Sequence, residues 1–114
     1  MNIVKNSNIK FMTVQEIKEL YDKNEINLID VREIEEWNTG HIPGAKFIPL
    51  SAFSITQIET FASSKKHLVL HCRSGRRCGI AAERMVNSGY KGQIIRMAGG
   101  ILEWANKGYL ITSQ

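Results

Sequence analysis

The hydrophobic pattern of the chain alternates between short apolar runs and segments in which apolar residues recur every three or four positions. The apolar runs predict strands at residues 9–12, 26–31, 47–48, 67–71 and 93–97. The spaced segments predict helices at residues 14–23, 33–37, 51–63, 75–87 and 101–107. Because strands alternate with helices of this length, we expect an α/β fold with a mainly parallel sheet that helices cover on both faces.

Capping residues indicate where several of these helices begin or end. Thr13 and Glu16 form a capping-box pattern before the apolar spacing of the first helix. Ser51 is the expected N-cap of the helix that would run to about Ser63. Gly89 is well placed to end the helix at residues 75–87.

The composition is that of a small globular domain. The 114 residues suffice for one domain, placed at residues 1–114 with its core at about 13–111, and 43% of them are hydrophobic. The net charge of +4 favours anionic ligands but is too small and too scattered to indicate nucleic acid. Two cysteines make no secreted disulfide framework, and no apolar run is long enough for a signal peptide or a membrane span. We therefore expect a cytoplasmic monomer that binds neither membrane nor nucleic acid.

The segment after the clearest buried strand carries the candidate chemistry. Ligands of parallel α/β sheets bind beyond the carboxyl ends of the strands, and the first residue there is Cys72, followed by Arg73, Ser74, Gly75, Arg76 and Arg77. Backbone amides at a helix N-terminus and nearby arginines lower the pKa of a cysteine from about 8.5 towards or below neutrality. Gly75 permits the tight backbone that lets successive amides converge on the sulfur. The alternative is a small buried hydrophobe at a strand end, beside a solvated helix start.

Three segments together resemble a known family. The sequence HCRSGRRCG, residues 71–79, resembles the active-site loop of rhodanese-like domains, in which the first cysteine is the nucleophile. The sequence LIDVREIEEWNTGHIPGAKFIPL, residues 28–50, resembles the upstream signature of the family. The sequence MAGGILEWANKGYLI, residues 97–111, resembles its closing segment. Order and spacing agree with those of single-domain thiosulfate sulfurtransferases over most of the chain.

This resemblance implies a fold and an activity. The fold would be a three-layer α/β/α domain with a five-stranded, mainly parallel sheet. The activity would be ping-pong sulfur transfer, in which Cys72 takes sulfane sulfur from thiosulfate or a persulfide donor and passes it to cyanide, a thiol or a protein. The residues that follow Cys72 would bind the anionic substrate, and the reaction would need no metal or organic cofactor. The implied partners are a small anionic sulfur donor such as thiosulfate and a protein that donates or accepts persulfide.

Two other functions are weighed against sulfur transfer. Related phosphatases and arsenate reductases place five residues between the cysteine and an arginine, whereas here Arg77 follows Cys72 after four and the next residue is Cys78. This shorter loop disfavours phosphate chemistry. A rhodanese-like module can also serve as a non-catalytic interaction domain, but such modules lack the nucleophile that this chain retains.

Four further residues near the loop have an expected role or direction. Asp30 and Arg32 lie at a strand end, where a pair of opposite charges would brace the active loop. Cys78 departs from the family pattern, which commonly has a small hydroxyl residue there. It is either a small buried helix residue or a resolving thiol that forms a disulfide with Cys72. His71 would point away from Cys72, because side chains alternate along a strand.

Overall fold

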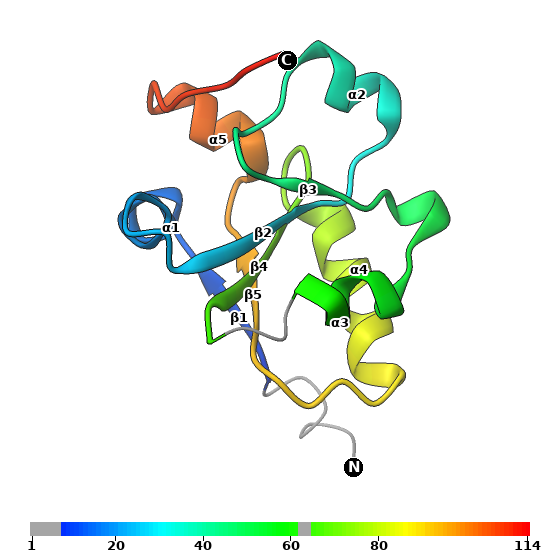
Figure 1. Ribbon diagram of the computed structural model, residues 1–114. Coiled ribbons are helices and arrows are strands. Elements are labelled where there is room, and N and C mark those ends of the chain that lie inside the picture. The colour runs from blue at the N-terminus through cyan, green and yellow to red at the C-terminus, as the bar shows by residue number, and fades with distance from the viewer. Residues whose placement is uncertain (1–7, 62–64) are drawn as a thin grey trace.

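The structure, a computed structural model that describes residues 8–61 and 65–114, is built around a parallel sheet with the strand order β1-β5-β4-β2-β3 (Figure 1). Its strands are β1 (Ile9–Met12), β2 (Ile26–Asp30), β3 (Lys46–Phe47), β4 (His67–His71) and β5 (Ile94–Met97). All neighbouring strands pair in parallel, and the register sets Asp30 opposite His71 at the carboxyl ends of β2 and β4. The sheet therefore brings its carboxyl ends to one edge, as the sequence predicts.

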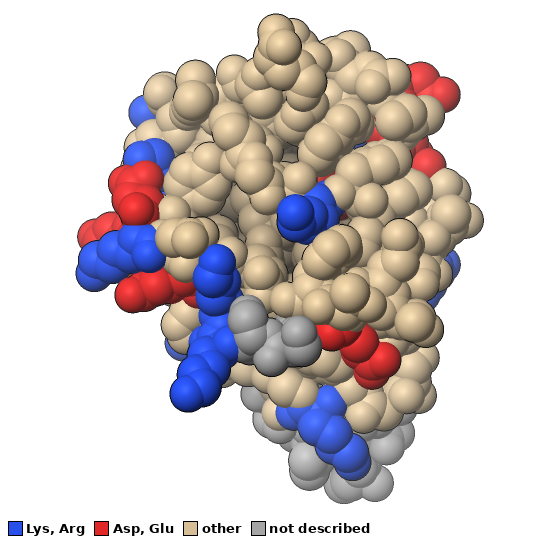
Figure 2. Space-filling view, viewed as in Figure 1, with Lys and Arg blue, Asp and Glu red and all other residues tan. Residues whose placement is uncertain are grey.

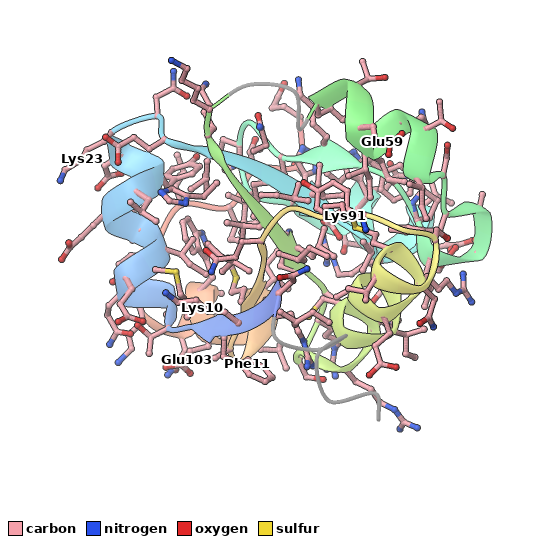
Figure 3. The ribbon with its side chains drawn as sticks, turned by 90° about the horizontal axis from the view of Figure 1, so that it is seen from below. Lys10, Phe11, Lys23, Glu59, Lys91 and Glu103 are labelled. Atoms are coloured by element: carbon pink, nitrogen blue, oxygen red, sulfur yellow. The ribbon has the colours of Figure 1, made fainter. Side chains whose placement is uncertain are left out.

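Helices cover both faces of this sheet. The helices are α1 (Val14–Asp22), α2 (Ile34–Thr39), α3 (Ile55–Phe61), α4 (Arg76–Asn87) and α5 (Gly100–Asn106), with a 3-10 turn at Leu50–Ala52. Helices α1 and α5 lie on one face and α3 and α4 on the other, while α2 lies beyond the carboxyl ends of the strands (Figures 1 and 3). The predicted three-layer α/β/α fold is confirmed.

The core is divided by the sheet into two clusters. Leu68 and Leu70 of β4 belong to the cluster beneath α3 and α4, whereas Val69 belongs to the cluster beneath α1 and α5. Because both faces of the strand are buried, β4 is a continuous apolar run rather than an alternating one. Cys72 continues the first cluster, which places its side chain on the α4 side of the sheet.

The predicted start of the third helix is wrong. Helix α3 begins at Ile55, and its first turn is capped by the Ser54 hydroxyl, which accepts a hydrogen bond from the amide of Gln57 at 3.2 Å. The hydroxyl of Ser51 instead donates to the carboxylate of Glu33, 18 residues earlier in the chain. The expected end at Ser63 lies outside the described residues. By contrast, the capping box that begins α1 is confirmed.

The surface carries charges of both signs side by side. Figure 2 shows basic and acidic side chains next to one another around α1, where Lys18 and Asp22 form an ion pair at 2.8 Å. Within residues 8–61 and 65–114, no helix has the length and apolar character needed to cross a membrane.

Candidate active site

Cys72 follows β4 directly, in the loop that leads into α4. Only 1% of its surface is exposed. Its Sγ accepts a hydrogen bond from the amide of Gly75 at 3.1 Å. Gly75 is the N-cap of α4 and has a φ of +116°, a backbone conformation that residues with a Cβ rarely adopt. The glycine thus allows the loop to turn tightly enough for its amides to surround the sulfur.

The pKa of Cys72 is lowered to about 5. The largest cause is a hydrogen bond from the side chain of Cys78, and the backbone amides of Cys78, Gly75 and Arg77 lower the pKa further, while burial opposes them. The site therefore holds Cys72 as a thiolate at neutral pH. A thiolate in this setting is a sulfur nucleophile.

The three arginines do less for the thiolate than the sequence leads one to expect. None of them contributes a side chain to the largest causes of the lowered Cys72 pKa. The guanidinium of Arg77 binds both carboxylate oxygens of Glu36 in α2, at 2.7 and 2.8 Å. Arg73 and Arg76 are exposed, as is Ser74 between them. The hydrogen bond from the Cys78 side chain and those from the backbone amides, rather than the arginine charges, are thus the main support of the thiolate.

The N-terminus of α5 holds the loop from the other side. The amide of Ile101 donates to the carbonyl of Cys72 at 2.9 Å, and that of Leu102 donates to the carbonyl of Arg73 at 3.1 Å. Gly100 makes this approach possible, because a Cβ there would lie 2.3 Å from the Arg73 carbonyl oxygen. The two carbonyls are turned towards α5, which leaves the amides of the loop to face the sulfur.

A buried charge pair lies beside the loop, as expected for Asp30 and Arg32. The guanidinium of Arg32 binds both carboxylate oxygens of Asp30, with a shortest distance of 2.8 Å, and donates to the carbonyl of Gly40 at 2.7 Å. Nε2 of His71 lies 3.6 Å from the Asp30 carboxylate, and its Nδ1 lies 3.2 Å from the carbonyl of Cys72. Burial lowers the pKa of His71, which favours the neutral ring at neutral pH. His71 therefore lies between this pair and the backbone of Cys72, with its Nε2 beyond hydrogen-bond distance of the carboxylate.

Cys78 lies in the first turn of α4 and is fully buried. Its thiol donates to the carbonyl of Gly75 at 3.2 Å, and its pKa is raised well above the usual range by its hydrogen bond with Cys72 and by burial. Cys78 is thus a protonated hydrogen-bond donor beside the candidate nucleophile, Cys72. That Cys78 acts as a resolving thiol stays a hypothesis, the alternative being a small buried helix residue.

Two side chains of the site are absent from the sequence-based predictions. Glu36 binds Arg77 from 41 residues away, and Arg96 of β5 donates from Nη2 to the carbonyl of Gly75 at 2.7 Å. Nothing in the sequence signals Glu36, which stands in a run of acidic residues. Arg96 could have been found, since alternation along its strand places it on the same face as the buried Ile94.

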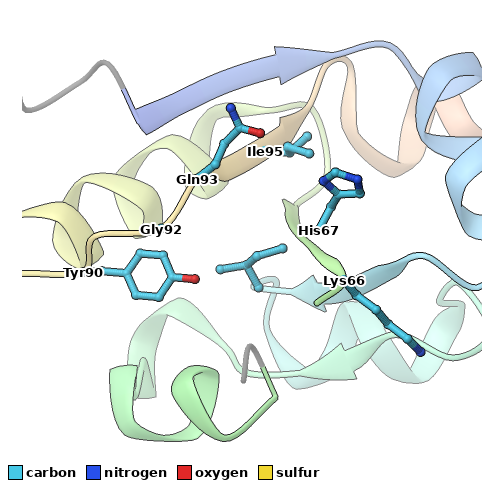
Figure 4. A pocket seen from close by; sticks show the side chains of 7 residues that line it. Lys66, His67, Tyr90, Gly92, Gln93 and Ile95 are labelled. Carbon is cyan, nitrogen blue, oxygen red and sulfur yellow. The ribbon is translucent and has the colours of Figure 1, made fainter. Parts of the chain in front are cut away.

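The cavity shown in Figure 4 is not part of this site. It encloses about 240 Å³ and is lined by Lys66, His67, Leu68, Tyr90, Gly92, Gln93 and Ile95. These residues lie at the amino ends of β4 and β5, or just before them, whereas Cys72 follows the carboxyl end of β4.

Comparisons with known proteins find relatives of this chain that are named for sulfur transfer. The chain is 34% identical over 102 residues to the putative sulfur carrier protein YrkF of Bacillus subtilis, covering 89% of this chain and 54% of that protein. It is 32% identical over 94 residues to a sulfurtransferase of Allochromatium vinosum, covering 82% of this chain and 85% of that protein. The chain therefore spans about half the length of the first relative and most of the second.

The fold is also that of solved structures. The crystal structure of a rhodanese-related protein from Thermoplasma volcanium superposes with a TM-score of 0.75 at 24% identity, covering 92% of this chain and 99% of that one. The Rhodanese-like domain family matches residues 13–107, which include the loop of Cys72 and the glycines that hold it. The chain belongs to the family of rhodanese-like domains.

Proposed function

We propose that this protein is a sulfurtransferase that carries sulfane sulfur as a persulfide on Cys72. The observation that carries the proposal is the Cys72 sulfur, which accepts the Gly75 amide at 3.1 Å and whose pKa is lowered to about 5. The names of two relatives, a putative sulfur carrier and a sulfurtransferase, support sulfur transfer in general. The persulfide and the choice of donor are the finer parts of the proposal.

The first half-reaction loads the sulfur. The Cys72 thiolate attacks the outer, sulfane sulfur of thiosulfate, and an S–S bond forms as the S–S bond of thiosulfate breaks. Sulfite leaves with the electron pair of the broken bond. A protein persulfide can replace thiosulfate as the donor, and its cysteine thiolate then leaves in the same way. No external oxidant or reductant is needed.

The second half-reaction transfers the outer sulfur from the Cys72 persulfide to an acceptor. A nucleophilic acceptor, such as cyanide or a thiolate, attacks the outer sulfur of the Cys72 persulfide. The S–S bond breaks, the acceptor keeps the outer sulfur, and Cys72 leaves as the thiolate that began the cycle. The same features that lower the pKa of Cys72 make it a good leaving group in this step.

The loop suits anionic sulfur compounds. Thiosulfate and a persulfide are both anionic, and the amides of the loop can hold their charge. Arg73 of the loop and Arg76 at the start of α4 are exposed and add positive charge for an approaching donor. Phosphate chemistry is disfavoured, because Arg77 already binds Glu36 through both terminal nitrogens.

The test is thiocyanate formation from thiosulfate and cyanide by the wild type and two cysteine variants. Cys72→Ser is expected to abolish the activity. Cys78→Ser is expected to retain it within a few-fold, because a serine hydroxyl can donate one hydrogen bond in place of the Cys78 thiol. A wild type with no activity, and with no sulfur added to Cys72 by thiosulfate or by a persulfide donor, would support the interaction-module function instead.

A further inference from the structure

The guanidinium of Arg96 in β5 binds the backbone of the active-site loop. Arg96 lies on the same face of the sheet as Ile94, which belongs to the cluster beneath α3 and α4. Its Nη2 donates to the carbonyl of Gly75 at 2.7 Å. The thiol of Cys78 donates to the same oxygen at 3.2 Å, so two side chains from different elements hold one peptide.

This peptide joins the loop to the first turn of α4. Gly75 has a φ of +116° and, without a Cβ, the conformational freedom to rotate. Before the Gly75 carbonyl, the amide of Gly75 donates to the Cys72 sulfur. After it, the amides of Arg77 and Cys78 also lower the pKa of Cys72. A fixed Gly75 carbonyl therefore fixes the relative direction of the amides that face the sulfur.

The guanidinium of Arg96 is itself held from two sides. Its Cζ lies 4.1 Å from the centre of the Phe11 ring, which β1 places at the edge of the sheet (Figure 3). On the α4 side, a Cβ at Gly79 would lie 2.6 Å from Nη2. The guanidinium thus occupies the room that the missing side chain of Gly79 leaves.

We infer that Arg96 is a positioning residue, which holds the Gly75 carbonyl and thereby keeps the backbone amides of the loop aimed at the Cys72 sulfur. Its consequence for turnover rests on the proposed sulfur transfer. The effect of Arg96 on the Cys72 thiolate does not depend on that proposal, because the thiolate forms before any reaction with a sulfur donor. The inference differs from a general role in folding, since Arg96 acts on the direction of a few amides.

The experiment is the pH dependence of alkylation of Cys72 by iodoacetamide, followed by peptide mass mapping. Besides Arg96, the titratable or charged side chains near Cys72 include His71 of β4, Cys78, Arg76 and Arg77 of α4, Arg73 of the loop and Glu36 of α2, which pairs with Arg77. The variants leave all of these in place. Mapping by peptide separates Cys72 from Cys78.

Three variants decide the matter. Arg96→Met removes the donor and the charge, and Gly79→Ala keeps the charge but displaces the guanidinium from the Gly75 carbonyl. Arg84→Met is the matched control, because it removes an arginine whose Nη1 donates to the carbonyl of Leu50, away from the loop. Thermal unfolding of each variant reports whether it folds.

The first two variants are expected to slow alkylation of Cys72 at pH 5 by about three- to tenfold and to move the midpoint of the profile upward. Arg84→Met is expected to match the wild type. If Arg96→Met does not fold, Gly79→Ala decides alone, since alanine favours the helix and the displaced group is the end of a flexible side chain. A Gly79→Ala or folded Arg96→Met profile equal to that of Arg84→Met overturns the inference. A wild type that never accepts sulfur overturns the proposed function and leaves this comparison intact.

Discussion

The amides of Ile101 and Leu102 in α5 donate hydrogen bonds to the active-site loop, and we call this pair of bonds the clamp. Two glycines of similar backbone conformation allow a quantitative test of it. Gly100 begins α5 and has a φ of +62°, and Gly108 follows the end of the same helix with a φ of +80°. A Cβ at Gly100 would lie 2.3 Å from the carbonyl oxygen of Arg73 and 2.7 Å from that of Cys72. A Cβ at Gly108 would meet nothing within 4 Å.

The expected magnitudes follow from this difference. Alanine in the left-handed region costs about 1 kcal/mol at either position. At Gly100 the clash is with backbone, which cannot move aside as a flexible side chain can. The hydrogen bonds that Ile101 and Leu102 donate to the loop are then lost, at about 1 kcal/mol each. We therefore expect Gly100→Ala to lower the free energy of unfolding by about 3 kcal/mol, and Gly108→Ala by about 1 kcal/mol.

Urea unfolding of both variants measures the stabilities, and alkylation of Cys72 at pH 5 measures the thiolate. Gly100→Ala is expected to slow alkylation, because a displaced loop no longer aims its amides at the sulfur, whereas Gly108→Ala is expected to leave it unchanged. Equal losses of stability in the two variants, with equal alkylation rates, would refute the clamp that we describe between α5 and the loop.

Three further predictions concern the side chains around the loop. Arg77→Met is expected to cost at most about 1 kcal/mol at neutral pH. The pKa of Glu36 is lowered to about 2 by its hydrogen bonds with Arg77, so this stabilisation is complete above the ordinary glutamate pKa and is lost as the pH falls towards 2; urea unfolding across that range checks it. Arg32→Leu leaves a buried carboxylate without its partner and is expected to cost about 3–5 kcal/mol, measured in the same way. Mild peroxide is expected to oxidise Cys72 without a crosslink to Cys78, whose raised pKa makes it a poor nucleophile; a crosslinked peptide in mass spectrometry would instead establish the resolving thiol.

The elements of the fold follow from local patterns in the sequence. The apolar run of residues 67–71 predicts β4 with the bounds that the structure has, and the Thr13 capping box predicts where α1 begins. The start of α3 shows what a local pattern omits. Both Ser51 and Ser54 precede the apolar spacing, and a contact between Ser51 and the distant Glu33 leaves Ser54 as the cap.

The candidate site divides in the same way. The candidate nucleophile and its loop can be predicted from a cysteine, a glycine and a helix start in one short segment. The side chains that support this loop cannot be predicted in the same way. Arg96 binds the Gly75 carbonyl from 21 residues away, and Glu36 binds Arg77 from 41 residues away. Positive charges that are close to Cys72 in the sequence need not act on its sulfur. Arg77 lies near Cys72 in the chain, but its guanidinium donates its hydrogen bonds to Glu36. Sequence proximity indicates which charges are available, and the fold decides what they bind.

The most direct test of the central claim is the intact mass of the protein after brief treatment with thiosulfate and removal of the excess. The account predicts a gain of one sulfur atom, mapped to the Cys72 peptide, which cyanide removes as thiocyanate and which the Cys72→Ser variant never acquires. A wild type that forms thiocyanate while its Cys72 never carries the added sulfur would contradict a persulfide on this residue.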